Sequence, residues 1–166
     1  RGCIPSKALL HVAKLVYEAR HAAAWGVAFG EPTIDVARLR GFKEQVVQKL
    51  TGGTGQLARQ RKITYLHGRA TIVDAKTFTV ATKDGESRVH FETGILATGS
   101  RPAVIPGLPP NSRRVLDSTS ALEIAEVPGR LLVIGGGYIG LELGTVYAAL
   151  GSKVTVIEAG AMFLGL

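Results

Sequence analysis

The chain of 166 residues has a single cysteine, few aromatic residues and no long apolar run. One cysteine excludes an internal disulfide framework and any metal site built from several thiolates. The apolar runs are shorter than the roughly 20 residues that a membrane-spanning helix needs. The formal net charge is +7, but the basic residues are scattered and only one tryptophan is present, which argues against nucleic-acid binding. What remains is the composition of an ordinary globular protein.

Two helices are expected in the first third of the chain. Apolar residues at helical spacing predict helices over 4–24 and 35–61, with Pro5 in the first turn of one and Asp35 as the N-cap of the other. The glycine-rich stretch TGGTG at 51–55 is expected to interrupt the second helix. The chain also starts without methionine, inside what looks like a motif, so we expect an internal piece of a longer protein.

From residue 62 the apolar pattern changes to a period of two. This change predicts strands over 62–73, 77–82 and 88–98, with a hairpin turn at Asp84-Gly85. The prolines that follow predict an irregular connection over 101–127, which ends in a short capped helix.

A nucleotide-binding pattern stands near the end of the chain. An apolar strand at 131–134 is followed by Gly135, Gly137 and Gly140 in G-x-G-x-x-G spacing, then by a helix and a second strand that ends at Glu158. The glycines allow a tight turn, close approach of a pyrophosphate to the backbone, and close packing of helix on strand. A carboxylate at the position of Glu158 suits the ribose hydroxyls of NAD and repels the extra phosphate of NADP. We therefore expect a dinucleotide site here, because strand, glycines, helix and acid all have the required spacing.

Cys3 stands at the expected start of the first helix. Unpaired N–H groups and the helix dipole stabilise a thiolate at such a position, which makes the sulfur a better nucleophile and electron donor. Lys7 adds positive charge one helical turn later. From these residues alone, a buried and unreactive cysteine remains the alternative.

Five stretches, taken together and in this order, resemble the flavin disulfide reductases, and among them the dihydrolipoamide dehydrogenases most closely. They are GCIPSK, LTGG with GQLARQRK, HGRA, ILATGS, and GGGYIGLELG with GSKVTVIE. The resemblance implies an incomplete α/β fold of the Rossmann-like FAD/NAD(P)-binding type, with parallel sheets and an inserted antiparallel β-meander. It also implies that residues 1–127 are the C-terminal part of an FAD-binding domain, and that 128–166 are the first βαβ unit of an NAD-binding domain.

The family assigns roles to matching positions. Cys3 corresponds to the flavin-side cysteine of a redox disulfide, whose partner would lie five positions earlier. Lys7 resembles the lysine beside the reactive flavin nitrogen, and Glu142 resembles the glutamate that pairs with this lysine. Further FAD contacts are expected at Gly68, Thr98, Gly99 and Ser100. NAD contacts are expected at Gly135, Gly137, Ile139, Gly140 and Glu158. Tyr138 stands where some relatives have an aromatic residue that covers the flavin until the nicotinamide displaces it, and this residue leaves the exact member of the family open.

The resemblance implies an oxidoreductase that oxidises protein-bound dihydrolipoamide and passes electrons through a Cys–Cys disulfide and FAD to NAD. The expected partners are a second copy in a homodimer and the lipoyl domains of 2-oxoacid dehydrogenase complexes, with no nucleic acid and no membrane. The expected location is the bacterial cytoplasm, with the mitochondrial matrix as the alternative, and the segment alone is expected to be inactive. Two other interpretations stay open: another flavin disulfide reductase such as mercuric reductase, or a non-catalytic nucleotide-binding segment in which Cys3 is structural.

Overall fold

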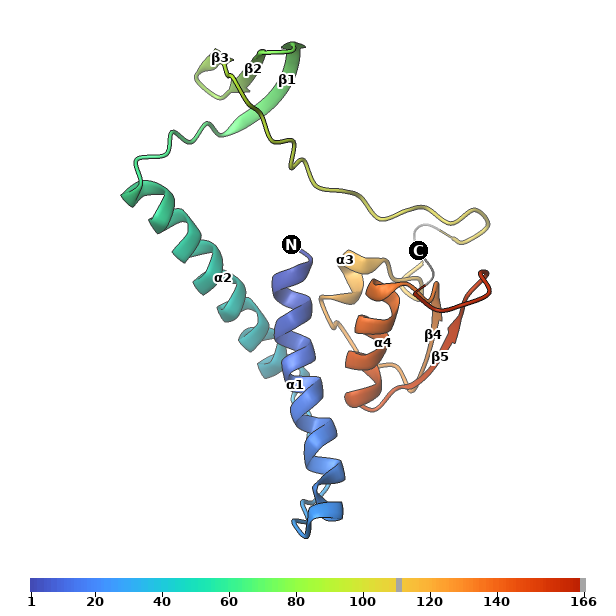
Figure 1. Cartoon of the computed structure of the whole chain (residues 1–166). Helices are drawn as coiled ribbons and strands as arrows, with labels where there is room; N and C mark the ends of the chain where they lie inside the picture. The colour runs from blue at the N-terminus through green and yellow to red at the C-terminus, as the bar shows by residue number, and fades with distance from the viewer. Residues whose placement is uncertain (110–111, 165–166) are drawn as a thin grey trace. The chain divides into compact units, whose positions relative to one another are not determined.

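The computed structural model describes residues 1–109 and 112–164, and these fall into two compact units (Figure 1). Unit 1 combines Arg1–Gly53 with the chain from Pro102 onward, and unit 2 is Thr54–Arg101. Each unit is described by itself. Within the described ranges, no helix combines the length and the apolar character needed to cross a membrane.

The first helix of unit 1 is α1, Cys3–His21, and a 3₁₀ turn, Ala22–Trp25, extends it. The extension ends at Gly26, whose φ of 84° lies in the left-handed region that glycine adopts without strain. The prediction of a helix over 4–24 is therefore confirmed. The helix start places Cys3 in the first turn of α1, where the side chain is exposed.

The second helix, α2, is continuous over Val36–Gln60. Asp35 caps it as expected, because its carboxylate accepts the backbone N–H three residues later at 3.0 Å. The expected interruption at 51–55 is wrong. Glycine lowers helix stability by only about 1 kcal/mol per residue and, unlike proline, keeps its backbone N–H donor, so the hydrogen-bond ladder continues through this stretch.

The C-terminal part of unit 1 is a β-α-β element. Strand β4, Arg130–Ile134, lies parallel to β5, Lys153–Ile157, and α4, Tyr138–Ala149, connects them. A short helix before them, α3, Ser118–Ala121, is capped by Asp117. These elements agree with the predicted strand, glycine turn, helix and strand.

The two-stranded sheet is covered on one face only among the described residues. Helix α4 packs on both strands, and no other described helix contacts them. Leu132 and Ile134 consequently remain exposed. The apolar character of β4 therefore does not lead to burial on both faces among the described residues, because burial of the second face requires a second covering layer.

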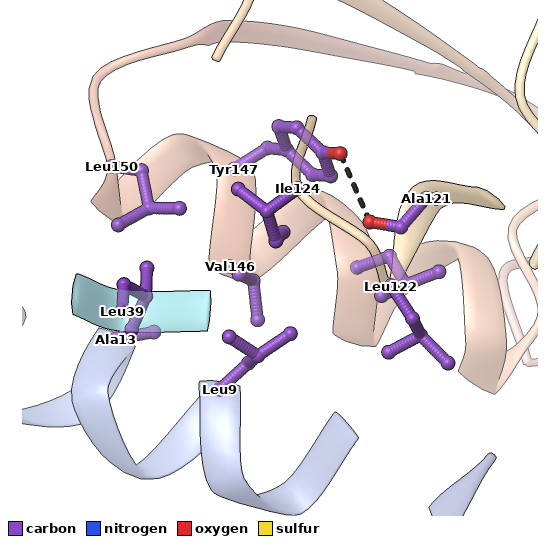
Figure 2. Packing of buried hydrophobic residues seen from close by; sticks show 10 residues of the cluster. Leu9, Ala13, Leu39, Ala121, Leu122, Ile124, Val146, Tyr147 and Leu150 are labelled. Atoms are coloured by element: carbon purple, nitrogen blue, oxygen red, sulfur yellow. Dashed lines mark hydrogen bonds between the residues drawn. The ribbon is translucent and has the colours of Figure 1, made fainter. Parts of the chain in front are cut away.

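The core of unit 1 forms where α1, α2, α3 and α4 meet (Figure 2). Its most deeply buried side chains are Leu9 of α1, Ile124 after α3, and Val146 and Tyr147 of α4. Burial of each such side chain contributes about 1.5–3 kcal/mol. The hydroxyl of Tyr147 donates to the carbonyl oxygen of Ala121 at 3.0 Å, so the buried phenol is satisfied. This core holds α1 and α4 side by side.

Unit 2 contains an antiparallel meander of β1, Gly68–Asp74, β2, Thr77–Thr82, and β3, Gly85–His90. The strand predicted over 77–82 is confirmed. The predicted hairpin turn is present but lies one residue earlier, at 83–84, because Gly85 already pairs with Thr82. The other two strands are shorter than predicted, because 62–67 and 91–98 lie outside the sheet. An apolar alternating segment becomes a strand only where a neighbouring strand accepts its hydrogen bonds, and no described strand lies beside these residues.

Candidate active site

The start of α1 presents Cys3 and Lys7 to solvent. No side chain caps this helix end, and Gly2 is its N-cap residue. The hydroxyl of Ser6 is buried and donates to the carbonyl oxygen of Cys3 at 3.3 Å, which ties the first turn together. The thiol is free and exposed, so the alternative of a buried cysteine is wrong, and the reactivity of Cys3 stays a prediction.

Lys7 reaches across to α4. Its ammonium forms an ion pair with Glu142, which lies 135 positions later in the sequence. The lysine side chain is 62% exposed and the glutamate side chain 28%, so water screens the pair and its contribution to stability is small. The contact matters for geometry: it joins the helix that begins at Cys3 to the helix that begins at the glycine loop.

The glycine loop between β4 and α4 has the backbone shape that a tight turn requires. Gly135 has a φ of 106° and donates its N–H to the carbonyl oxygen of Ile157 at 2.8 Å. A Cβ atom on Gly140 would lie 2.3 Å from the carbonyl oxygen of Gly135, so this position has no room for a side chain. A Cβ atom on Gly137 would meet nothing within 4 Å, so the backbone there is open to an approaching group.

Helix α4 begins at this loop without a side-chain cap, and Tyr138 and Ile139 in its first turn are exposed. The N–H groups of a first helical turn have no partner within the helix and favour an anion such as a phosphate. The loop, the uncapped helix start and the open space at Gly137 together fit the pyrophosphate of a dinucleotide.

Glu158 lies at the end of β5, beside the glycine loop. Its carboxylate accepts the N–H of Gly136 at 2.6 Å and that of Gly160 at 2.8 Å. The bonds from Gly160 and Gly136, in that order, lower the pKa of Glu158, which is therefore a carboxylate at neutral pH. A carboxylate has about four lone-pair sites, so the exposed side chain can still accept hydrogen bonds from sugar hydroxyls.

A shallow hollow lies next to this carboxylate. It is lined by Gly137, Glu158, Gly160, Ala161, Met162 and Leu164. Leu164 donates its backbone N–H to the carbonyl oxygen of Gly136 at 3.0 Å, so the segment after β5 folds back onto the glycine loop. None of these described lining residues has a basic side chain that would pair with the 2′-phosphate of NADP.

The other expected FAD contacts belong to unit 2 and are described only within it. Gly68 is the first residue of β1, and a Cβ atom there would lie 2.2 Å from the carbonyl oxygen of Ala81. Gly99 has a φ of 76°, in the left-handed region that glycine adopts without strain, and it lies between the exposed residues Thr98 and Ser100. The structure therefore brings Lys7 and Glu142 together in unit 1, whereas Gly68 and 98–100 remain predictions.

The sequence analysis missed the backbone groups that hold Glu158. Gly136 and Gly160 act through their N–H groups, which every residue except proline has, so no residue type signals this role. It also missed Lys43 of α2, whose side chain is buried against the segment after α3. Lysine is almost always exposed, so a lysine within an amphipathic helix predicts an exposed position. Its burial could be expected only from knowledge of its hydrogen-bond and ion-pair partners. Within 1–109 and 112–164, no cluster of ligating side chains is arranged for a metal ion.

Comparison with a protein-family model gives a match over residues 1–165, to the family described as pyridine nucleotide-disulphide oxidoreductase. Among curated proteins, the dihydrolipoyl dehydrogenase of Haemophilus influenzae is 52% identical over 158 residues, and that of Vibrio cholerae is 48% identical over 157 residues. Each match covers 95% of this chain and 33% of the relative. The chain thus spans about a third of the length of the curated relatives that it matches.

Two solved structures show the same fold. The chain matches the HOCl-induced flavoprotein disulfide reductase RclA from Escherichia coli, in its Cu(II) complex, with a TM-score of 0.73 and 32% identity. This match covers 98% of the chain and 34% of that protein. It also matches LpdA from Mycobacterium tuberculosis with a TM-score of 0.77 and 24% identity, over 99% of the chain and 36% of that protein. The expected Rossmann-like α/β fold with parallel and antiparallel sheets is confirmed.

Proposed function

The chain belongs to the pyridine nucleotide-disulphide oxidoreductase family, and we propose that it is the segment of a dihydrolipoyl dehydrogenase that connects the flavin-side redox cysteine to the start of the NAD site. The identities of 52% and 48% to two such enzymes support this choice within the family. Because the chain spans a third of their length, the activity belongs to the full-length protein that contains this sequence. Residues 1–127 would then be part of its FAD domain, and 128–166 the beginning of its NAD domain.

One observation carries the proposal: the ion pair between Lys7 and Glu142 joins α1 to α4. The exposed thiol of Cys3 lies one helical turn from Lys7, and the dinucleotide loop lies one helical turn before Glu142. A redox cysteine and a nucleotide-binding helix are therefore held on neighbouring helices. Electrons can pass from a thiol to a nicotinamide only if the cysteine and the nucleotide site lie close together.

FAD and NAD are the cofactors of this proposal, and when bound they carry an electron pair from the disulfide centre to the nicotinamide. The chain's own residues bind and orient them. The glycine loop and the first turn of α4 would hold the NAD pyrophosphate, and Glu158 would accept the hydroxyls of its adenosine ribose. In unit 1, Lys7 would place a positive charge beside the flavin, and Glu142 holds that charge in place.

In this proposal Cys3 forms a disulfide with a second cysteine of the full-length protein. The dithiol of a dihydrolipoyl group attacks that disulfide by thiol exchange, so the lipoyl group leaves as a disulfide and the protein keeps two thiols. Those thiols return to a disulfide as NAD⁺ becomes NADH, and one proton is released in the full reaction. The exposed position of Cys3 in the first turn of α1 leaves its sulfur accessible to this exchange.

The direct test replaces Cys3 by serine in the full-length protein. We expect NAD⁺ reduction by dihydrolipoamide to be lost, because serine cannot form the disulfide. NADH oxidation by a quinone acceptor, which needs both cofactors but no thiol, should be retained and shows that the variant is folded. Lys14→Met, an exposed change on the same helix, serves as the matched control. If dihydrolipoamide oxidation survives in Cys3→Ser, the proposed role of Cys3 is wrong.

A second candidate keeps the fold and changes the substrate. The 32% identity to the flavoprotein disulfide reductase RclA supports a member of the family with another substrate. A substrate survey of the full-length protein decides between them: rapid turnover of dihydrolipoamide supports the first proposal, and its absence beside active NADH oxidation supports the second.

For the proposed dihydrolipoyl dehydrogenase, we further propose a homodimer in the bacterial cytoplasm that serves the lipoyl domains of 2-oxoacid dehydrogenase complexes.

A further inference from the structure

Lys43 of α2 is the only charged residue that is fully buried in the described part of the chain. Its side chain is 3% exposed, and its ammonium has three acceptors. It donates to the carbonyl oxygen of Leu122 at 3.0 Å, and it pairs with Glu123 at 3.3 Å and with Glu44 at 3.0 Å. Two of these acceptors belong to the turn that follows α3, 79 and 80 positions later in the sequence. A buried charge with this set of partners is costly to disturb, because removal of one partner leaves the others unpaired.

The turn that Lys43 holds has an unfavourable backbone conformation. Ile124 has a φ of 44°, in the left-handed region that β-branched residues rarely adopt. Here the side chain of Ile124 is completely buried. Such a conformation persists only where the surrounding structure holds it, and the bonds from Lys43 to the two preceding residues supply part of that restraint.

Ile124 also lies in the core between the two helices that carry the candidate site. Figure 2 shows it among Leu9 of α1 and Val146 and Tyr147 of α4, in one buried cluster. A change in the turn would therefore change the packing of α1 against α4. Close-packed cores transmit such shifts because they contain few voids.

We propose that Lys43 is a positioning residue: it holds the Leu122–Ile124 turn, in which Ile124 is left-handed, and so sets the placement of α1 against α4. Whether this helix placement matters for catalysis, through the Lys7–Glu142 pair, rests on the function proposed above. The placement itself does not depend on that function, since it concerns only the packing of unit 1.

The test is amide hydrogen exchange of the full-length protein, measured by mass spectrometry for Lys43→Met, Lys43→Arg and the control Lys49→Met. Methionine keeps most of the volume of lysine and loses all three polar contacts. Lys49 lies on the same helix, is exposed and has no recorded ion pair among the described residues. The amides of Leu122, Glu123 and Ile124 all donate to carbonyls of α3, so each has protection to lose.

In Lys43→Met we expect exchange at 122–124 to become about 10- to 100-fold faster, since a hydrogen bond to a charged group is lost. Peptides from α1 and α4 should accelerate more than those from β4 and β5. Lys43→Arg should restore most of the protection, and Lys49→Met should match the unchanged protein. If Lys43 only stabilised the fold as a whole, its replacement would accelerate the exchange of all slow amides by one common factor.

Uniform acceleration, or the same result for Lys43→Met and Lys49→Met, would overturn the proposal. If Lys43→Met does not fold, Glu123→Gln replaces it, because this variant keeps the bond to Leu122 and weakens one ion pair. Faster exchange in the turn and, to a smaller extent, in α1 and α4, with β4 and β5 unchanged, then supports the proposal, and unchanged exchange in the turn or in the two helices overturns it. Exchange needs no turnover, so failure here leaves the proposed enzyme function untouched, and loss of that function leaves this result untouched.

Discussion

Replacement of Gly140 by alanine should damage the dinucleotide site, whereas the same change at Gly144, one turn later on α4, should not. A Cβ atom at Gly140 would lie 2.3 Å from the carbonyl oxygen of Gly135 and 3.0 Å from Val133. The first contact is with backbone, so the glycine loop or the start of α4 must move by roughly 1 Å to restore a normal separation. A Cβ atom at Gly144 would lie 3.5 Å from Val154 and 3.6 Å from Val133, which is ordinary contact.

The magnitudes follow from this difference. Overpacking of this kind costs about 1–3 kcal/mol, which corresponds to about a 5- to 150-fold loss of NADH affinity if the strain is relieved by moving the loop. At Gly144 the alanine gains up to about 1 kcal/mol of helix propensity and should leave affinity unchanged. Both variants change one glycine to alanine within the same helix, so they differ only in the space available.

The assay is a calorimetric titration of the full-length protein with NADH, together with urea denaturation of each variant. We expect weaker binding for Gly140→Ala and near-normal binding for Gly144→Ala. Equal affinities in the two variants would refute the argument that the helix must approach the loop this closely. A loss of affinity at Gly144 alone would show that helix packing on the strands, and not the loop, limits binding.

Two other predictions concern the core and the carboxylate. Tyr147→Phe removes the bond to the buried carbonyl of Ala121 and should lower the free energy of unfolding by about 1 kcal/mol, measured by urea denaturation; an unchanged value would show that water replaces the bond. The pKa of Glu158 is lowered by the N–H groups of Gly160 and Gly136, so a carbon-detected NMR titration should place it below the usual glutamate value of about 4.3. The stability that the Glu158 carboxylate contributes is fully present at pH values above the usual glutamate pKa, and it is lost as the pH falls through the lowered pKa. Glu158→Gln should abolish this pH dependence.

Local patterns predicted most of unit 1 correctly. The helix at the start of the chain, the Asp35 cap and the β-α-β element follow from periodicity and capping residues, which act over a few positions. The glycine spacing also predicted a turn at Gly135 and close packing at Gly140, because both are consequences of a missing side chain.

Two expectations failed for different reasons: glycine is a weaker helix breaker than expected, and a strand depends on a distant neighbour. Residues 51–55 remain helical, since glycine weakens a helix without breaking its hydrogen bonds. Residues 62–67 and 91–98 have strand-like sequences but lie in no sheet, since no described strand pairs with them. A strand is completed by its partner, and the period of two says nothing about whether a partner is present.

The sequence alone therefore determined the residue types of the site and their order: a thiol at a helix start, a glycine loop and an acid after the second strand. Only the tertiary structure decided which of them meet. The pairing of Lys7 with Glu142 spans 135 positions, and the burial of Lys43 against Leu122 spans 79. Such contacts depend on how the helices pack, and helix packing is set by the summed burial of many side chains and not by any short pattern. For the same reason the strained Ile124 could not be anticipated, because only its surroundings in the core hold it.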